Sequence, residues 1–392
     1  MRSSKTESVW LGWLCLGRLG AALPFMMYAG ALTSVAPAWG MTAQAAGSIQ
    51  TAFNFSYGVS LVATSALADR VGARRVMLWS AWLTALAAAA CALLARSWLS
   101  GLVLFAAVGA AQGGIYASSI LLVAERVAPH RLGAAVGWLL AASSLGYFVS
   151  VALAGAAAGR FGYRAAFLVC GAGPALGLIA VVASLRSGTD LARPPSGRKN
   201  PGDRGPLLVT IGYTAHCWEL LGMWAWMPAF LSTVLDPLSV AAAIHCAGGL
   251  ASLSTGWLSD RFGRKPVLVA LGFLGAACSF TIGWSMHQSK PVVLFLAALY
   301  GFAALGDSPV LSAAMTESVE AGRLGTALAV RSILGFGAGG LAPLAFGSLL
   351  GAQSAGLQAP WGRSFAALGC GGILAGVCAL LLPETLSERR LP

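Results

Sequence analysis

The sequence predicts an all-α membrane protein of twelve transmembrane helices in two six-helix, pseudo-symmetric bundles. Three observations lead to this fold class. The 392 residues are 57% hydrophobic and only 10% charged. Long apolar segments follow one another along the whole chain. A charged motif, DRVGARR at Asp69–Arg75, returns as DRFGRK at Asp260–Lys265, about half a chain later. Since such a charged cluster is costly inside lipid, each copy is expected in a short loop at one membrane face.

The composition excludes several broad classes of protein. A soluble domain carries about 25% charged residues, so this chain could not cover a surface that faces water. The net charge of +12 is dispersed over short loops, and a basic stripe that would bind nucleic acid is missing. The eight cysteines fall inside apolar segments without paired or metal-type spacing. We therefore expect no metal site and no nucleic-acid partner.

The apolar segments define the expected spans, because about 20 apolar residues cross a bilayer. The predicted spans are residues 9–36, 47–67, 75–95, 99–122, 132–158, 164–185, 207–234, 239–258, 266–286, 291–316, 323–350 and 364–383. The polar stretch 186–206 lacks apolar periodicity and is expected to be a cytoplasmic linker. It separates an N-terminal bundle, 1–185, from a C-terminal bundle, 207–392.

The distribution of basic residues predicts the orientation. With both termini in the cytoplasm, 18 Lys and Arg residues fall on the cytoplasmic side and 5 on the other, as the positive-inside rule requires. The first apolar run is longer than the core of a signal peptide, which indicates a retained first span. The excess of Arg over Lys and the abundance of Ala and Gly suggest a bacterial protein of the cytoplasmic (inner) membrane.

The two halves correspond at more positions than the charged motif. At one constant offset, polar and glycine positions of the first half match those of the second: Gly109, Gly114, Glu125, Arg131 and Gly133 with Gly301, Gly306, Glu317, Arg323 and Gly325. Chance matching of apolar sequence would not keep so many polar positions in register. The sequence therefore predicts six helices repeated in parallel.

Together these features resemble the major facilitator superfamily over essentially the whole chain. The family motif Gly-x-x-x-Asp-Arg-x-Gly-x-Arg-Arg/Lys is matched first by Asp69, Arg70, Gly72, Arg74 and Arg75, with Ser65 at the leading glycine position. The second copy supplies Gly256, Asp260, Arg261, Gly263, Arg264 and Lys265. The resemblance implies a monomeric transporter that works by alternating access, with these loops clasping the two halves as a gate. The alternative is a purely topological role for the arginines.

A second family pattern points away from one branch. The proline-glycine signature of span 5 in drug–proton antiporters is absent, because Tyr147 stands where the proline would be. The missing proline makes drug or metabolite efflux less favoured, and we keep it as an alternative function.

Ionisable residues at membrane depth are candidate site residues, because lipid tolerates few charges. They are Arg18, His216, Glu219, Asp307 and Arg331, with His245 in span 8. Asp307 and Arg331 are both expected about 13 Å from the same membrane face, at about 1.5 Å per residue. We therefore expect an ion pair between them, acting either as a proton- or substrate-sensitive switch or as a static structural pair.

Span 7 carries polar residues at helical spacing. Tyr213, His216 and Glu219 fall on one face, with Glu219 near the middle of the bilayer. A buried carboxylate can carry a proton, and His216 could relay it. The alternative is a self-satisfied Glu219–His216 hydrogen bond between helices.

Span 1 and span 4 supply further candidates. Arg18 offers a forked donor for a carboxylate if it points inward, and none if it extends to the headgroups. Gln112 and Tyr116 could add neutral hydrogen bonds. Met223 and Met227, one turn apart, could bind Cu(I), but such a Met and aromatic stripe is more often packing.

The overall reading is a secondary active transporter that moves a small polar solute, first of all an organic anion, and couples its movement to protons. The alternatives are drug or metabolite efflux and, less favoured, import of copper or a vitamin. No phosphate-binding loop, nucleophile elbow or zinc spacing is present, so neither an enzyme nor a cofactor is expected. The expected partners are a small-molecule substrate, protons and membrane lipid.

Overall fold

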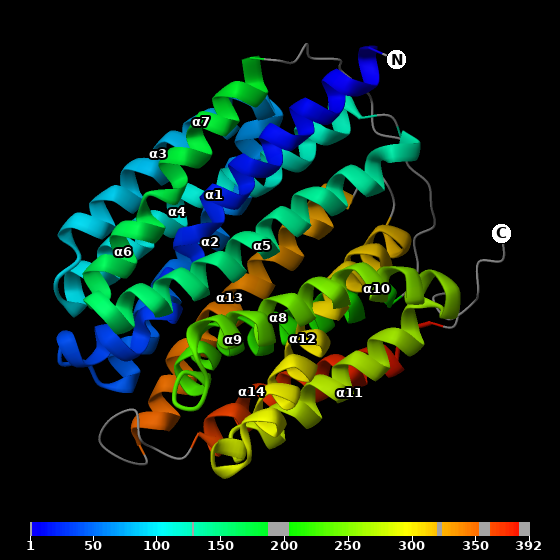
Figure 1. Ribbon diagram of the computed structural model, residues 1–392. Helices are drawn as coiled ribbons and strands as arrows, with labels where there is room; N and C mark the ends of the chain where they lie inside the picture. Colours follow the sequence, from blue (N-terminus) through cyan, green and yellow to red (C-terminus); the bar gives the residue numbers. More distant parts are fainter. Residues whose placement is uncertain (1, 128, 187–203, 320–323, 353–360, 384–392) are drawn as a thin grey trace. The chain divides into compact units, whose positions relative to one another are not determined.

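The first half of the chain forms six membrane spans. The computed structural model (Figure 1) describes residues 2–127, 129–186, 204–319, 324–352 and 361–383, in which every regular element is helical. The first half comprises α1 (Arg2–Ala38), α2 (Ala43–Val71), α3 (Ala73–Leu94), α4 (Trp98–Arg126), α5 (Pro129–Phe161), α6 (Tyr163–Gly171) and α7 (Gly173–Arg186). A break at Ala172 divides the sixth span into α6 and α7.

The second half repeats this plan. It comprises α8 (Gly205–Leu231), α9 (Pro237–Ala241), the π-helical turn η1 (Ala242–Cys246), α10 (Ala247–Phe262), α11 (Arg264–Ile282), the short 3₁₀ turn η2 (Ser285–His287), α12 (Lys290–Ser318), α13 (Leu324–Gly351) and α14 (Gly362–Leu380). Because α9, η1 and α10 are continuous, they form one span. The twelve predicted spans and the all-α fold class are thus confirmed.

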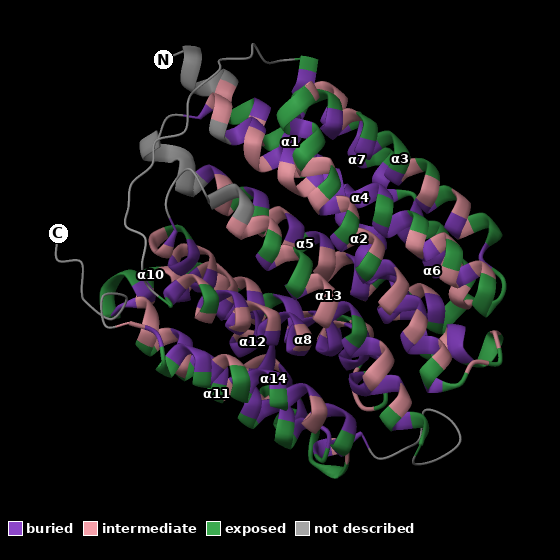
Figure 2. Cartoon of the chain, turned by 180° about the vertical axis from the view of Figure 1, so that it is seen from behind, coloured by how far each residue is buried: buried purple, intermediate pink, exposed green. Residues whose placement is uncertain are grey.

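Most spans are apolar enough to cross a membrane by composition alone. Among the described residues, 10 helices meet that criterion. The two spans outside this group, α2 and α8, carry more polar and aromatic side chains. Figure 2 shows that most of α8 is buried, and its polar residues therefore face protein.

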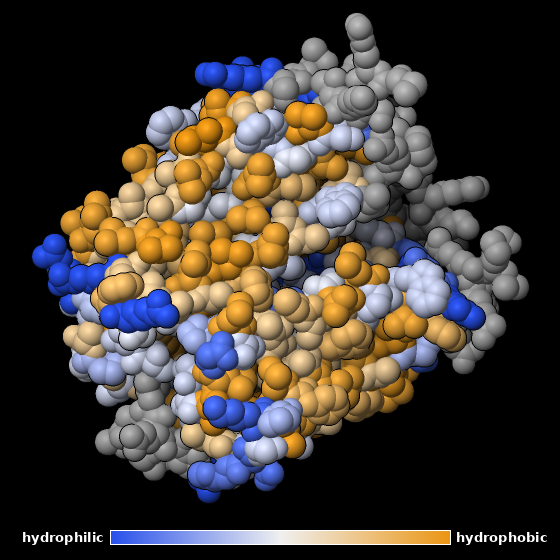
Figure 3. All heavy atoms as spheres, in the orientation of Figure 1, coloured by the Kyte–Doolittle hydropathy of each residue, from blue (hydrophilic) through white to orange (hydrophobic). Residues whose placement is uncertain are grey.

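Outward-facing surfaces of the helices are strongly apolar. On α3, Trp79, Trp82 and Leu86 are 47%, 53% and 61% exposed, and Figure 3 shows hydrophobic side chains covering most of one face of the molecule. Exposed apolar surface on this scale is what a bilayer covers.

The chain divides into two compact units. Unit 1 contains Met1–Gly40 and Ala52–Pro194, and unit 2 contains Met41–Thr51 and Pro195–Pro392. The first residues of α2 thus group with unit 2, where the backbone N–H of Leu344 donates to Thr51 Oγ1 at 3.2 Å. The expected linker lies largely outside the described residues, which omit 187–203, so the division at 186–206 stays a prediction.

A single glycine joins the helices at each copy of the charged motif. Gly72 connects α2 to α3 at φ 91°, and Gly263 connects α10 to α11 at φ 92°. Residues with a Cβ rarely adopt this positive φ, so the turn requires glycine. The predicted short loop is therefore one residue long, and the charged residues lie on the helical turns that flank it.

Glycines also allow close packing within each unit. A Cβ at Gly20 on α1 would lie 2.6 Å from the Gly173 carbonyl oxygen on α7. A Cβ at Gly272 on α11 would lie 2.7 Å from the Gly376 backbone nitrogen on α14. Such contacts replace the hydrophobic effect as the cause of helix association in lipid. They fix the helices that carry the candidate residues.

Candidate functional site

Arg18 lies inside unit 1 and does not extend to the surface. It is 8% exposed, and its Nη2 donates to Ser143 Oγ on α5 at 2.7 Å. Its guanidinium carbon lies 5.3 Å from the centre of the Tyr116 ring on α4. None of the described residues forms an ion pair with Arg18. A buried cation held only by neutral groups is a suitable receptor for an anion.

Tyrosines surround this guanidinium. The hydroxyl groups of Tyr57, Tyr116 and Tyr147 are near enough to Arg18 to interact with it electrostatically. Phe25 contacts the rings of Tyr57 and Tyr147 at centroid distances of 5.8 and 5.0 Å. The guanidinium therefore faces flat aromatic surfaces as well as hydroxyl donors.

Gln112, a further candidate, has a structural bond. Its Nε2 donates to the Ala21 carbonyl oxygen at 2.6 Å, which ties α4 to α1 one turn beyond Arg18. Gln112 and Arg18 are thus brought together on neighbouring turns.

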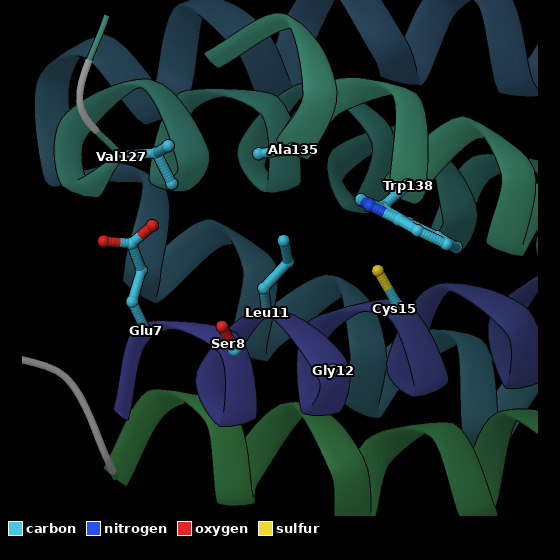
Figure 4. A pocket seen from close by; sticks show the side chains of 8 residues that line it. All are labelled: Glu7, Ser8, Leu11, Gly12, Cys15, Val127, Ala135 and Trp138. Carbon is cyan, nitrogen blue, oxygen red and sulfur yellow. The ribbon is translucent and has the colours of Figure 1, made fainter. Parts of the chain in front are cut away.

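A cavity of about 340 Å³ in unit 1 ends one helical turn before Arg18. Figure 4 shows Leu11 and Cys15 projecting from α1 toward Ala135 and Trp138 on α5. Glu7 lies farther from Arg18 along the same side of α1. Small-molecule sites have volumes of about 300–1,000 Å³ and are mostly apolar. The cavity has the size and lining for a small organic solute.

In unit 2 the structure pairs Asp307 with His216. His216 Nδ1 on α8 lies 2.8 Å from Asp307 Oδ1 on α12, and Ser308 Oγ lies 2.9 Å from His216 Nε2. Asp307 Oδ1 has no hydrogen bond of good geometry, so the contact with His216 is mainly electrostatic. Both ring nitrogens of His216 are nevertheless engaged with α12.

The expected ion pair between Asp307 and Arg331 is wrong. Within the described ranges, no ion pair joins them, and Asp307 takes His216 as its basic neighbour. The depth argument placed both residues correctly along their helices but left side-chain direction open. His216 lies closer because α8 packs directly against α12.

Arg331 instead stacks on Tyr213. Its guanidinium carbon lies 4.1 Å from the centre of the Tyr213 ring, and the side chain is buried at 8% exposure. Its Nε and Nη1 have no hydrogen-bond partner in the structure. A buried donor without a partner costs about 1–3 kcal/mol, and more when it is charged. The arrangement is therefore incomplete without an acceptor such as a carboxylate.

Glu219 faces a different set of helices. A Cβ at Gly372 on α14 would lie 2.8 Å from Glu219 Oε2, and one at Gly275 on α11 would lie 3.1 Å from it. Two glycines thus make room for the carboxylate, which also interacts with the Tyr300 hydroxyl. The alternative of a Glu219–His216 hydrogen bond is wrong, because the His216 nitrogens lie against Asp307 and Ser308.

The second copy of the charged motif is a network of ion pairs. Arg264 contacts Asp260 Oδ1 at 2.5 Å and Glu317 Oε1 at 3.1 Å, and Lys265 Nζ donates to the Leu382 carbonyl oxygen at 2.8 Å. Arg261 lies over the Trp257 ring at 5.6 Å. Asp260 thus binds Arg264, on the first turn of the next helix.

Glu317 was not among the predicted site residues. The sequence feature that could have indicated it is its position in the internal repeat, where it corresponds to Glu125.

In the first copy of the charged motif, the charged residues Asp69, Arg70, Arg74 and Arg75 are exposed. Gly256 has open space where a side chain would be.

The methionines considered for copper lie in the hydrophobic core. Met223 and Met227 are both 0% exposed. His245 lies in the π-helical turn beside Trp224, with ring centroids 6.2 Å apart. In the part of the chain that the structure describes, no group of three His, Cys, Asp or Glu side chains could hold a metal ion.

The sequence profile of the Major Facilitator Superfamily matches residues 14–244 and 238–392. The chain belongs to this superfamily. The same fold is found in the crystal structure of a bacterial homolog of the human lysosomal transporter Spinster, in an inward-facing and unoccupied conformation. That structure superposes with a TM-score of 0.76 at 14% identity, covering 99% of each chain.

Two curated relatives are also similar in sequence. The "Probable 4-methylmuconolactone transporter" of Cupriavidus pinatubonensis is 24% identical over 358 residues, covering 83% of this chain and 81% of that protein. "Multidrug transporter AQR1" of Candida glabrata is 34% identical over 141 residues, which are 35% of this chain and 22% of that protein. This superfamily member is therefore a multi-pass membrane transporter and not an enzyme.

Proposed function

We propose that this transporter is a secondary active carrier that moves a small organic anion together with protons by alternating access. The observation that carries the proposal is Arg331, a buried guanidinium whose Nε and Nη1 donors have no partner. A carboxylate would accept a charge-assisted hydrogen bond from either donor. Arg18 offers a second buried guanidinium in unit 1, beside a cavity of suitable volume.

Both arginines lie against tyrosine rings, Tyr116 and Tyr213. An aromatic face beside a guanidinium favours a flat solute that carries a carboxylate. The relative named for a methylmuconolactone, a small organic lactone, agrees with this substrate class.

Proton coupling is proposed for the acidic groups of unit 2. Asp307 and Glu219 are buried, at 6% and 5% exposure. Asp307 has an imidazole as its neighbour, and an imidazole can accept and pass on a proton. A carboxylate that gains a proton while the anion is bound would offset the charge that crosses the membrane.

The remaining features follow the superfamily pattern. We place the monomer in a bacterial cytoplasmic membrane, with both termini and the 186–206 linker in the cytoplasm, because basic residues concentrate there. Two bundles, 1–185 and 207–392, would alternate access. The Arg264 contacts with Asp260 and Glu317 would break and reform as part of the gate.

A matched pair of ligands tests the substrate class. Benzoate and benzamide share a ring and differ in charge, and muconate and muconolactone extend the set. We expect benzoate or another acid to raise the Tm of the purified protein, benzamide to leave it unchanged, and Arg331→Met to abolish the shift. Equal shifts with benzoate and benzamide would refute an anion site.

A further inference from the structure

A small cavity in unit 2 lies beside Asp307. It is lined by Gly212 on α8, Leu268 on α11, Leu311 on α12, Cys378 on α14 and Leu382 just beyond α14. Its volume is about 10 Å³, close to the minimum that holds one water molecule. The Asp307 carboxylate and the Cys378 thiol are polar groups that such a water could bond.

The cavity lies between the buried carboxylate and the end of unit 2 that carries the charged motif. Gly212 is about two turns, or roughly 10 Å, inside α8. Leu268 is one turn inside α11, and Leu382 follows the last turn of α14. At that end, Lys265 Nζ donates to the Leu382 carbonyl oxygen at 2.8 Å. A motif residue thus fixes the backbone of a residue that lines the cavity.

Nothing in the repeat requires a carboxylate at this position. At the offset that relates Gly109 to Gly301, the residue equivalent to Asp307 is Ile115, which is buried at 1% exposure. The fold therefore accepts an apolar side chain at this place. The carboxylate at this position of the repeat is therefore specific to unit 2.

We propose that this cavity holds the water through which Asp307 exchanges protons with the motif-bearing end of unit 2, and that Lys265 restricts the exchange by holding Leu382 in place. A hydronium in the cavity gives a proton to the carboxylate: one of its O–H bonds breaks, an O–H bond to Asp307 forms, and neutral water remains. The reverse step returns the proton, and no electron is gained or lost.

Several other ionisable groups near Asp307 could also exchange protons with it. They are His216, Cys217 and Glu219 on α8, Cys378 on α14 and, through Cys217, Arg331 on α13. Thr255, from α10, and Leu268, from α11, pack nearby and do not ionise. His216 lies on the α8 turn beyond Gly212, so the cavity and the imidazole approach Asp307 from different levels of α8.

The proposal rests on the proton coupling proposed above, but its test needs no substrate. With the protein in lipid nanodiscs, the infrared difference between wild type and Asp307→Asn isolates the carbonyl stretch of protonated Asp307. Transfer to D₂O shifts this band at the rate of proton exchange. A wrong substrate class would leave that rate unaffected, so the two proposals fail separately.

Filling the cavity is the decisive change. A Cβ at Gly212 meets Cys378 Cβ at 3.6 Å and Leu311 Cδ2 at 3.9 Å, so the Cβ itself fits in ordinary contact. The two methyl groups of Gly212→Val should occupy the cavity and slow proton exchange at least about tenfold. Gly249→Val is the control, since a Cβ at Gly249 meets open space. Cys378→Leu fills the cavity from α14 and should slow exchange if Gly212→Val misfolds.

Removing the hydrogen bond from Lys265 to the Leu382 carbonyl oxygen tests the second half of the proposal. Lys265→Met should accelerate exchange at least about threefold, because it removes one hydrogen bond that holds Leu382, while Lys290→Met at the opposite end of the unit should not. Unchanged exchange in the filled variants would overturn the water route. The same holds if Asp307 shows no protonated band at any pH at which the protein stays folded. An unchanged exchange rate in Lys265→Met would overturn the claim that Lys265 restricts proton exchange.

Discussion

The imidazole of His216 on α8 lies 2.8 Å from the carboxylate of Asp307 on α12. Its other nitrogen faces Ser308, one residue further along α12. Two titratable groups on different helices therefore form one unit in which a proton can be held. Their contact couples α8, which carries Tyr213, to α12, and both helices border the small cavity.

Replacing His216 tests this coupling. In His216→Gln, Asp307 loses its basic neighbour, and the electrostatic contact between α8 and α12 is removed. We expect pH-gradient-driven uptake of the best-stabilising acid to fall at least about tenfold, while exchange at equal pH persists. Ser308→Ala, which removes only a neutral partner, should reduce uptake much less. Equal loss of uptake and exchange in His216→Gln would show that the pair is structural.

Arg18 provides a second prediction, about recognition. Arg18→Lys keeps the charge but loses the planar fork, so the KM for the transported acid should rise at least about tenfold. Ser143→Ala removes one neutral bond to Arg18 and should raise KM about threefold to fivefold. Transport kinetics in proteoliposomes give both values. An unchanged KM in Arg18→Lys would exclude Arg18 from substrate binding.

Because α1 packs closely on α7, replacing one helical glycine by alanine should destabilise the protein and not stabilise it. Alanine is the better helix former by about 1 kcal/mol, yet a Cβ at Gly20 would lie 2.6 Å from the Gly173 carbonyl oxygen. Gly20→Ala should therefore lower stability by about 1–3 kcal/mol, seen as a lower Tm in detergent. Gly12→Ala on the same helix meets nothing within 4 Å and should leave Tm unchanged or raise it. A stabilised Gly20→Ala would contradict the packing.

The Arg264–Glu317 pair predicts coupled effects. The two side chains are 12% and 19% exposed, so removal of one leaves a partly buried charge. Arg264→Gln and Glu317→Gln should each destabilise the protein by about 1 kcal/mol or more, and the double variant should lose less than their sum. A double-mutant cycle by thermal unfolding measures the coupling. Strict additivity would mean that the pair has no net interaction.

Asp236, in the connection before α9, gives a pH prediction. Its carboxylate accepts from the Ser239 hydroxyl and from the backbone N–H groups of Ser239 and Leu238, and these bonds lower the pKa of Asp236. A lowered folded-state pKa stabilises the protein above the unfolded-state pKa, and this contribution is lost as pH falls through the folded value.

The measurement compares two substitutions at this cap. Asp236→Asn keeps a capping oxygen without titrating, whereas Asp236→Ala removes the cap. The Tm difference between wild type and Asp236→Ala should be present at neutral pH and shrink in acid. A Tm difference that grows on acidification would contradict a lowered pKa of Asp236 in the folded protein.

How far the sequence predicts this molecule depends on the kind of feature. Apolar length alone located the spans, and the repeated glycine of the charged motif located two connections, because both properties are local. The sequence also identified Arg18 as a candidate, and in the structure its side chain is buried. The twelve-helix fold and the superfamily followed from these features.

Partners of the buried charges were harder to predict. Depth along a helix gave Asp307 and Arg331 the same level, but which neighbour each side chain meets depends on helix rotation, and apolar helices carry no periodic signal for it. Hence Arg331 was expected to pair with Asp307, and His216 was considered as a relay for or partner of Glu219. The structure instead places His216 beside Asp307 and Arg331 on the Tyr213 ring. The cavity beside Asp307 has no sequence signature, since it is formed by the absence of a side chain at Gly212.

The most direct test of the central claim follows proton movement during transport. Proteoliposomes that contain the purified protein and an internal pH dye receive, from outside, the acid that stabilises the protein most. The account predicts internal acidification that accompanies uptake in wild type and disappears in Arg331→Met. Uptake of that acid with no change in internal pH, or equal uptake of its neutral amide, would contradict it.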